Sequence, residues 1–401
     1  MSITRLGTAN MYDRTISNIS KQQAELASQM EHTSAGKRVL RASDDPVAAA
    51  QAERARTRLD RIETDKRMLD AQTATIEYAE GTLGEINSAV QEFRSLLVQA
   101  GNGTYNQTQR DTLVEQLESL STQIQSYANR TDSNGLPLFR GLDTASSTPF
   151  LNGTSSIQSG QPNSGEYTIT NSLDGSLAFF SGSTGNGVLA VDIGAANQGT
   201  AWTDVGTIRD PAAATALTTP IDITFQDGAD GMEYSTDGGT TWTTYKSGDA
   251  ISVAGMDLVI TGDPQAGDTF TVKPSETISI FEAMDRAIDT VRNGGNPDGS
   301  TNSGALAHGI AQSLAELDTA LNRISTVRGV AGDLLNQAQR MNNTLDARDE
   351  QVQAQRVAAE DYDSEGMVKA IAQLKTQETA VSAALQSYAS IQKLSLFDYI
   401  R

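Results

Sequence analysis

The segment from residue 62 to residue 97 reads IETDKRMLDAQTATIEYAEGTLGEINSAVQEFRSLL. Apolar side chains recur in it at intervals of seven residues, at Ile62, Leu69, Ile76, Leu83, Val90 and Leu97. A strict repeat of this length predicts one long α-helix packed in a left-handed coiled coil or helical bundle. Ala79, Ile86 and Phe93 supply part of a second row. The other faces of the helix are polar, so the stripe needs a partner.

Heptad rows also flank this segment and recur in the C-terminal part. A shorter helix is predicted after the Gly101-Asn102-Gly103 turn, with its rows at Leu113, Leu120 and Tyr127 and at Leu117 and Ile124. The C-terminal repeat runs through Ile310, Leu317, Ile324, Ala331, Ala338, Leu345 and Val352. Its second row is expected four residues on, at Leu314, Leu321 and Leu335, with Arg328 interrupting.

The outermost segments, 1–40 and 365–401, have apolar stripes but few large aromatic side chains. We expect them to be terminal assembly helices, mostly disordered in the monomer, that become ordered as coiled-coil layers on assembly. The predicted assembly or chaperone interface consists of Tyr12, Ile16, Ile19, Leu26, Met367, Ile371, Leu374, Val381, Leu385, Tyr388, Leu396 and Phe397.

The middle of the chain, residues 141–275, has a different texture. It is rich in Gly, Thr, Ser and Asp, and apolar residues alternate with period two at 221–225, 250–254 and 269–272. Glycine-rich turns separate these runs, which predicts antiparallel β-structure with hairpins. The expected fold class is α+β multidomain. A long coiled-coil-like bundle from both chain ends, 41–140 and 276–364, carries an inserted β domain.

The composition limits the possible functions. The 401 residues include 30 Lys and Arg against 50 Asp and Glu, a net charge of -20, so neither nucleic acid nor an anionic membrane is an expected partner. There is no cysteine, which excludes disulfides and thiolate chemistry. We expect no cleavable signal peptide, because the first residues lack an apolar core, and no membrane span.

No pattern in the chain predicts catalysis, a cofactor or a metal. The two histidines, His32 and His308, lie in helical patterns without a second ligand at metal spacing, so we expect exposed helix residues. Gly36-Lys37 is not a phosphate loop, because Arg38 stands where Ser or Thr is required. Asp227 to Gly231 lacks the calcium-loop spacing and predicts a hairpin turn.

One motif has a known counterpart elsewhere. Ser235 to Trp242 reads STDGGTTW and resembles the Asp-box of sialidase-like propellers, where it is structural and recurs blade by blade. Here it occurs once. The Asp side chain can cap backbone N–H groups, so we interpret the motif as a β-hairpin between 232–234 and 243–245. Whether it also binds a ligand is left open.

The stretch from residue 34 to residue 50, SAGKRVLRASDDPVAAA, predicts the corner between two helices. The preferred register has Asp45 as the N-cap and Pro46 as the first helical residue, and Ser43 is the alternative cap. The cations Lys37, Arg38 and Arg41 leave two interpretations. Either they lie in a solvated loop, or they contact an acidic neighbouring subunit.

Two sets of motifs lie at the two ends of the chain, at Leu26-Ala-Ser, 34–39, 42–51, 127–131, 138–141, 360–370, 377–380 and 394–400. Taken together, they resemble the flagellin superfamily of bacterial axial proteins. Asp44-Asp45-Pro46 and the ending Leu-Ser-Leu-Phe-Asp-Tyr favour its hook-associated members over flagellin itself, and 251–272 is similar to their outer-domain segments.

The resemblance implies a secreted structural subunit of the bacterial flagellum, extracellular and not an enzyme. It would form a short layer between the hook and the flagellin filament. Implied partners are further copies of itself, a neighbouring hook-associated protein, flagellin and an export chaperone on the C-terminal helix. Export would use the flagellar type III apparatus. The alternatives are a filament-forming flagellin, a glycan-binding protein suggested by the single Asp-box, and a generic coiled-coil scaffold or adhesin.

Overall fold

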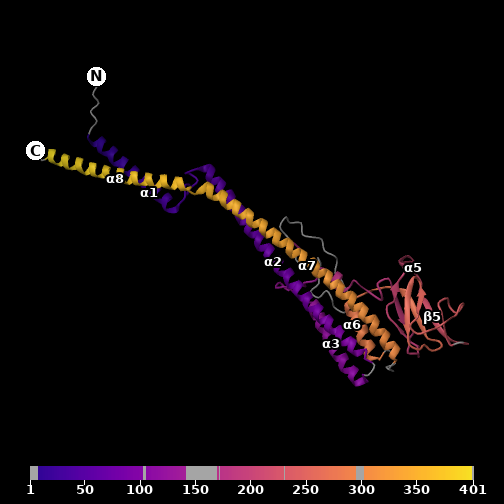
Figure 1. Ribbon diagram of the computed structural model, residues 1–401. Helices are drawn as coiled ribbons and strands as arrows, with labels where there is room; N and C mark the ends of the chain where they lie inside the picture. Colours follow the sequence, from indigo (N-terminus) through magenta and orange to yellow (C-terminus); the bar gives the residue numbers. More distant parts are fainter. Residues whose placement is uncertain are drawn as a thin grey trace. The chain divides into compact units, whose positions relative to one another are not determined.

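The computed structural model describes residues 8–102, 105–140, 169–170, 172–229, 231–294 and 302–399, with side chains from residue 13 to residue 390 (Figure 1). The chain divides into two compact units. The first comprises Met1–Arg67 with Met341–Arg401, and the second comprises Met68–Arg340. Both ends of the chain therefore contribute to the first unit, and two long helices extend into both units.

These long helices are α2 (Pro46–Ala100) and α7 (Ser303–Glu360). Every member of the α2 heptad row is buried, and so is every member of the α7 row except Val352, which is half-buried. Ion pairs show that the helices are antiparallel, because the partner on α7 falls in number as α2 rises. The pairs are Lys66 with Asp346 at 2.8 Å, Glu80 with Arg328 at 2.6 Å and Arg94 with Asp318 at 2.8 Å.

The second row of α7 differs from the expectation. Leu314, Leu321 and Leu335 are only half-buried, whereas the row three residues on, Ser313, Ala320 and Val327, is buried. The helix α6 (Ile280–Arg292) packs on that side of α7: a Cβ added to Gly309 would lie 2.5 Å from Thr290. Small side chains fit this close approach, and the larger leucines lie at the margin of the seam.

Two shorter helices complete the helical part of the second unit. In α3 (Gln107–Ala128), Asn106 and Gln109 form a capping box, and Leu113, Leu117, Leu120 and Ile124 are buried as predicted. Ser279 caps α6, whose buried face includes Phe281, Met284 and Ile288. The helices α3 and α6 pack against each other. Among the described residues, no helix is long and apolar enough to cross a membrane.

The β domain consists of antiparallel sheets, which confirms the predicted class. The larger sheet has the order β2-β10-β5-β6-β7, and in the smaller one β9 lies between β3, β4 and β8. Phe225, Phe270, Met256 and Leu258 lie in the core between them. The bounds are β1 (Gly182–Ser183), β2 (Leu189–Ile193), β3 (Trp202–Thr203), β4 (Thr207–Ile208), β5 (Ile221–Gly228), β6 (Gly231–Ser235), β7 (Thr243–Thr244), β8 (Ala250–Val253), β9 (Met256–Thr261), β10 (Thr269–Pro274) and β11 (Thr277–Ile278), with short helices α4 (Gly175–Phe179) and α5 (Pro211–Ala216).

The first turns of α7 dock onto this domain, and they correct the expectation for His308. The His308 side chain is buried rather than exposed, and its nitrogens lie 2.9 Å from the Thr203 carbonyl oxygen and 3.1 Å from that of Val191. Burial lowers the pKa of His308, although both carbonyl contacts favour the protonated ring. Asn302 caps α7 and donates to the Gly199 carbonyl at 3.0 Å.

Two turns further along α7, a second buried group can titrate. Glu316 is 5% exposed, and its carboxylate lies 3.5 Å from the Arg286 guanidinium. Burial raises the pKa of Glu316 to about 7, and Arg286 only partly opposes this shift. Because the folded state binds this proton more tightly than the unfolded state, the stability it contributes is present below about pH 4.5. That stability is lost as the pH rises to about 7.

We therefore predict that Glu316→Gln stabilises the protein at pH 8, by up to roughly 3 kcal/mol, and has a much smaller effect at pH 4.5. Urea unfolding of wild type and variant across this pH range measures the difference between their free energies of unfolding. His308 titrates in both proteins, so its contribution, which has the opposite pH dependence, cancels from that difference. Glu282→Gln is the matched control, because Glu282 also pairs with Arg286 but is exposed. A Glu316→Gln protein less stable than wild type at pH 8 would contradict the assignment.

Candidate assembly interface

The corner between α1 (Thr8–Ala35) and α2 has the predicted register. Gly36 adopts a positive φ of 69° just after α1, a conformation that glycine tolerates. One Asp45 oxygen accepts hydrogen bonds from the N–H groups of Val47 at 3.1 Å and Ala48 at 3.0 Å, so Asp45 is the N-cap and Pro46 is the first helical residue. The Ala48 N–H and the Arg38 guanidinium hold the pKa of Asp45 below its ordinary value.

This corner is joined to the break between α7 and α8 (Ser364–Tyr399). The N–H groups of Arg38 and Val39 donate to the Glu360 carbonyl at 2.7 and 3.0 Å, and the Tyr362 N–H donates to the Gly36 carbonyl at 3.1 Å. Residues more than three hundred positions apart therefore share backbone hydrogen bonds. These hydrogen bonds fix the ends of α1 and α7 and the starts of α2 and α8.

A buried carboxylate lies at the centre of this contact. The Glu360 side chain is 3% exposed; it accepts hydrogen bonds from Lys37 Nζ at 2.6 Å and from Arg56 Nη2 at 2.9 Å. Burial alone would raise the pKa of Glu360, but its bonds to Lys37 and Arg56 hold it below the ordinary value. We call residues 36–39, Arg56 and 360–362 the Glu360 junction.

The three cations left open by the sequence all have partners within the chain. Lys37 pairs with Glu360, and Arg41 pairs with Glu31 at 3.0 Å. Arg38 pairs with Asp45 at 3.0 Å and donates to the Ala359 carbonyl at 3.0 Å. The side chains of all three nevertheless stay partly exposed, at 37%, 45% and 67% in chain order, so contact with an acidic neighbouring subunit stays a prediction. His32 is half-buried in this corner, with Nδ1 3.1 Å from the Lys37 carbonyl oxygen, so it is not exposed as expected.

Beyond the junction, α1 and α8 pack against each other and divide the predicted interface residues. Ile19 and Val381 are buried, while Leu26, Met367, Leu374 and Tyr388 are half-buried. Ile16, Ile371 and Leu385 remain exposed, together with Met30 and Val368. Two helices cover only one stripe on each other, which leaves the second apolar row uncovered. The side chains of Tyr12, Leu396 and Phe397 lie outside the described residues.

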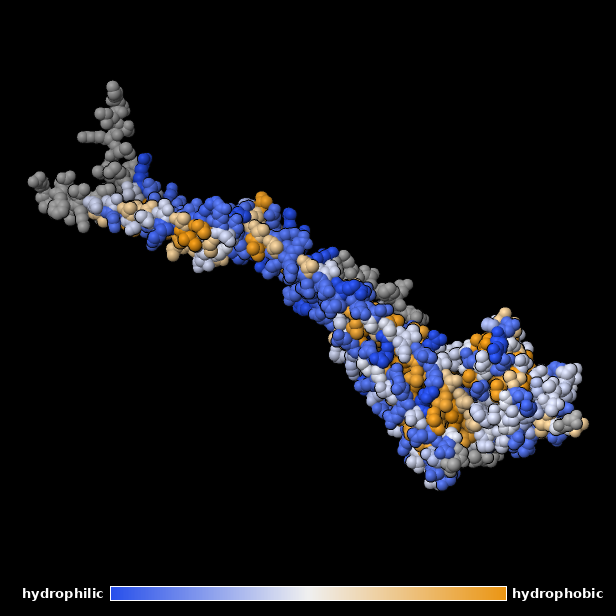
Figure 2. Space-filling model, in the orientation of Figure 1, coloured by the Kyte–Doolittle hydropathy of each residue, from blue (hydrophilic) through white to orange (hydrophobic). Residues whose placement is uncertain are grey.

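Apolar side chains are visible on the surface of this helix pair in the space-filling view (Figure 2). The exposed fractions are 47% for Ile16, 55% for Met30, 67% for Val368, 50% for Ile371 and 42% for Leu385. We call these five residues the exposed apolar row. Single exposed apolar residues are common in soluble proteins, but a set of them on paired helices is typical of an interaction surface.

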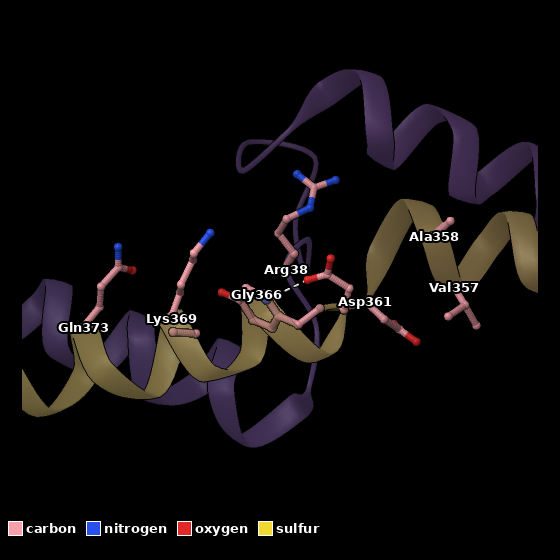
Figure 3. A pocket seen from close by; sticks show the side chains of 10 residues that line it. Arg38, Val357, Ala358, Asp361, Gly366, Lys369 and Gln373 are labelled. Atoms are coloured by element: carbon pink, nitrogen blue, oxygen red, sulfur yellow. Dashed lines mark hydrogen bonds between the residues drawn. The ribbon is translucent and has the colours of Figure 1, made fainter.

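A hollow of about 560 Å³ lies beside the break between α7 and α8 (Figure 3). Apolar groups from Val357, Ala358 and Ala370 line part of it, while Lys369 and Gln373 extend along the same side of α8. The Asp363 carboxylate accepts the Gly366 N–H at 2.6 Å and so caps α8. The hollow combines apolar, cationic and anionic groups.

The other candidate motifs are structural. Asp237 accepts hydrogen bonds from Ser235, Thr240 and Thr241, including one of 2.6 Å from Thr241 Oγ1, so both its oxygens are engaged within the turn. The strands β6 and β7 pair on either side, which confirms the predicted hairpin. Residues 227 and 232 likewise pair across the β5–β6 hairpin. In the part of the chain that the structure describes, no group of acidic or histidine side chains could hold a metal.

We predict that Glu360→Gln destabilises the first unit by about 2 kcal/mol, because two cations then lose their buried carboxylate. Since the folded pKa is lowered, this stability is present above about pH 4.5 and is lost as the pH falls through the folded pKa. Urea unfolding at pH 7 and at lower pH measures both effects. The control is Glu365→Gln, which removes an exposed partner of Lys369. Equal losses in the two variants would contradict the role of the junction.

Comparison with known proteins agrees with this architecture. The family model for the bacterial flagellin N-terminal helical region matches residues 7–144. The chain is 33% identical over 187 residues to flagellar hook-associated protein 3 of Salmonella typhimurium, which covers 45% of this chain and 55% of that protein. The chain thus spans about half the length of the curated relatives it matches. The flagellin of Bacillus subtilis matches over 136 residues at 32% identity, covering 33% of this chain and 45% of that protein.

Solved structures extend the likeness over more of the chain. The crystal structure of flagellar hook-associated protein 3 from Legionella pneumophila covers 75% of this chain and 97% of its own, with a TM-score of 0.64 and 26% identity. A flagellar junction protein from the same organism covers 72% of this chain and 99% of its own, with a TM-score of 0.62 and 27% identity. In its N-terminal helical region the chain is similar to bacterial flagellin, and over most of its length it is similar to flagellar hook-associated protein 3.

Proposed function

We propose that this chain is a structural subunit of the bacterial flagellum that forms the layer joining the hook to the flagellin filament. The observation that carries the proposal is the match of 75% of this chain to almost the full length of a solved hook-associated protein 3. The matches to flagellin are shorter and cover about a third of this chain. The function is mechanical rather than catalytic.

The proposed mechanism uses the surface that α1 and α8 leave uncovered. Fully burying one aliphatic side chain contributes about 1.5–3 kcal/mol, so covering the exposed apolar row can drive association between copies. Among the described side chains of α1 and α8, the buried apolar ones are few, namely Ile19, Ala370 and Val381. Such a thin contact supports the expectation that segments 1–40 and 365–401 are largely disordered in the monomer and order on assembly.

The same surface has a use before assembly. An export chaperone that covers Ile371 and Leu385 on α8 would keep the row from associating prematurely. Export through the flagellar type III apparatus would then place the protein outside the cell. There one face of the layer would meet a neighbouring hook-associated protein and the other would meet flagellin.

Filament-forming flagellin is the second candidate, favoured by the match of residues 7–144 to the flagellin helical region. A glycan-binding role has less support, because both oxygens of the Asp237 carboxylate already accept hydrogen bonds within their own turn.

Labelled electron microscopy of flagella distinguishes the first two candidates. We expect a band confined to the far end of the hook, because a junction layer has a limited number of positions. Label along the whole filament, or long filaments grown from the pure concentrated protein on filament seeds, would instead identify a flagellin.

The exposed apolar row makes a separate prediction. The double substitution Ile371→Ser with Leu385→Ser should reduce incorporation into flagella and weaken chaperone binding, while the free energy of unfolding stays within about 0.5 kcal/mol. Quantitative blotting of sheared flagella and pull-down with the chaperone measure these effects. Val98→Ser on α2 is the control, since Val98 is 51% exposed and lies outside the row. Normal incorporation of the double variant into flagella would show that the exposed apolar row is not part of the assembly interface.

A further inference from the structure

The part of α2 that lies in the first unit carries three arginines without partners. Arg54, Arg58 and Arg61 are exposed, and among the described residues none of them makes an ion pair or a hydrogen bond. Their spacing of four and three residues puts them within about 60° of one another on the helix surface. Like charges at this spacing repel. We call them the arginine stripe.

The stripe lies on the opposite flank of α2 from the chain's own ion pairs. Lys66 and Arg56 reach Asp346 and Glu360 on the other flank. At about 100° per residue, Lys66 and Arg56 fall to one side of the buried Ile62, and the stripe falls to the other. The acidic groups of α7 in this unit therefore do not neutralise it.

The matching charges lie on the other face of the same helix pair. Asp349 and Glu350 on α7 follow Asp346 by three and four residues, so they share the flank that carries the Lys66 ion pair. Neither has an ion pair within the described residues. With Lys66 beside Asp346 and the helices antiparallel, residues 349–350 lie beside residues 62–63 of α2. They are therefore level with Arg61 to within about one turn.

Positive charge on one face and negative charge on the opposite face, within about two to three turns of each other along the helices, suits copies placed side by side. In a layer of identical subunits related by rotation, two different faces of the chain meet at each contact. A two-fold dimer through the stripe would instead bring arginine against arginine. Resting on the proposed function, we propose that the arginine stripe of one subunit pairs with Asp349 and Glu350 of the next subunit in the layer.

A charge-swap experiment in cells that lack the native protein tests this pairing. The full-length triple variant Arg54→Glu, Arg58→Glu, Arg61→Glu should lower retention on flagella by about tenfold, the combined effect expected of a few exposed ion pairs. Asp349→Lys with Glu350→Lys should also lower it. All five substitutions together should restore retention to within about twofold of wild type. The control is Arg67→Glu with Arg323→Glu, two exposed arginines outside the stripe.

Unchanged retention of the triple variant would overturn the proposal. If the triple variant loses retention and the variant with all five substitutions does not regain it, a second copy is not the partner of the stripe, and a different acidic protein is indicated. Thermal unfolding of each secreted variant, with Arg→Gln at the three stripe positions as a milder replacement, separates lost pairing from misfolding. If wild type itself is absent from the hook–filament boundary, the proposed function fails, whereas rescue by charge reversal still reports on the stripe wherever the protein assembles.

Discussion

The antiparallel seam between α2 and α7 is the contact on which the other features depend. It brings segments from the two ends of the chain together through buried heptad rows, and ion pairs along its flank fix the register. A helix with one apolar stripe is not stable alone, so each of these helices needs the other. In the first unit, α1 and α8 also pack against each other.

The Glu360 junction adds an electrostatic constraint to the seam. A carboxylate this buried is costly unless it is paired and hydrogen-bonded, and Lys37 and Arg56 reach it from two different segments of the chain. Its backbone carbonyl meanwhile holds the corner loop. One residue thereby links the end of α7 to the loop before α2 and to α2 itself. The helices that end here have defined starting points, while their outer stripes remain available for other molecules.

Periodicity and turn chemistry made much of this architecture predictable. The row from Ile62 to Leu97 required a helix, and Asp45 followed by Pro46 required its start, because these signals are local. The Asp-box was predictable as a hairpin for the same reason. The burial of His308 was not predictable, because it depends on contacts with a β domain that begins far away in the sequence. The small residues on both sides of it, Ala307 and Gly309, were the available hint of close packing.

Partners that are distant in the sequence account for the other differences between the expected and the observed structure. Nothing local distinguishes Glu360 from the acidic residues after it, and its burial follows from cations more than three hundred residues away. The second row of α7 was misplaced because α6 approaches from the side that carries Ser313 and Ala320 rather than the side with the leucines. Ile16, Ile371 and Leu385 in the exposed apolar row belong to the interface predicted from the sequence; the structure shows that they are exposed, and their role in assembly stays a prediction.

The central claim is that the ends of the chain form an assembly surface that is completed only by other molecules. Hydrogen exchange measured on the full chain, first as the isolated monomer and then in purified flagella, tests it most directly. The account predicts rapid exchange at residues 1–35 and 370–401 in the monomer and strong protection of the same residues after assembly. Strong protection of both segments in the monomer would contradict it.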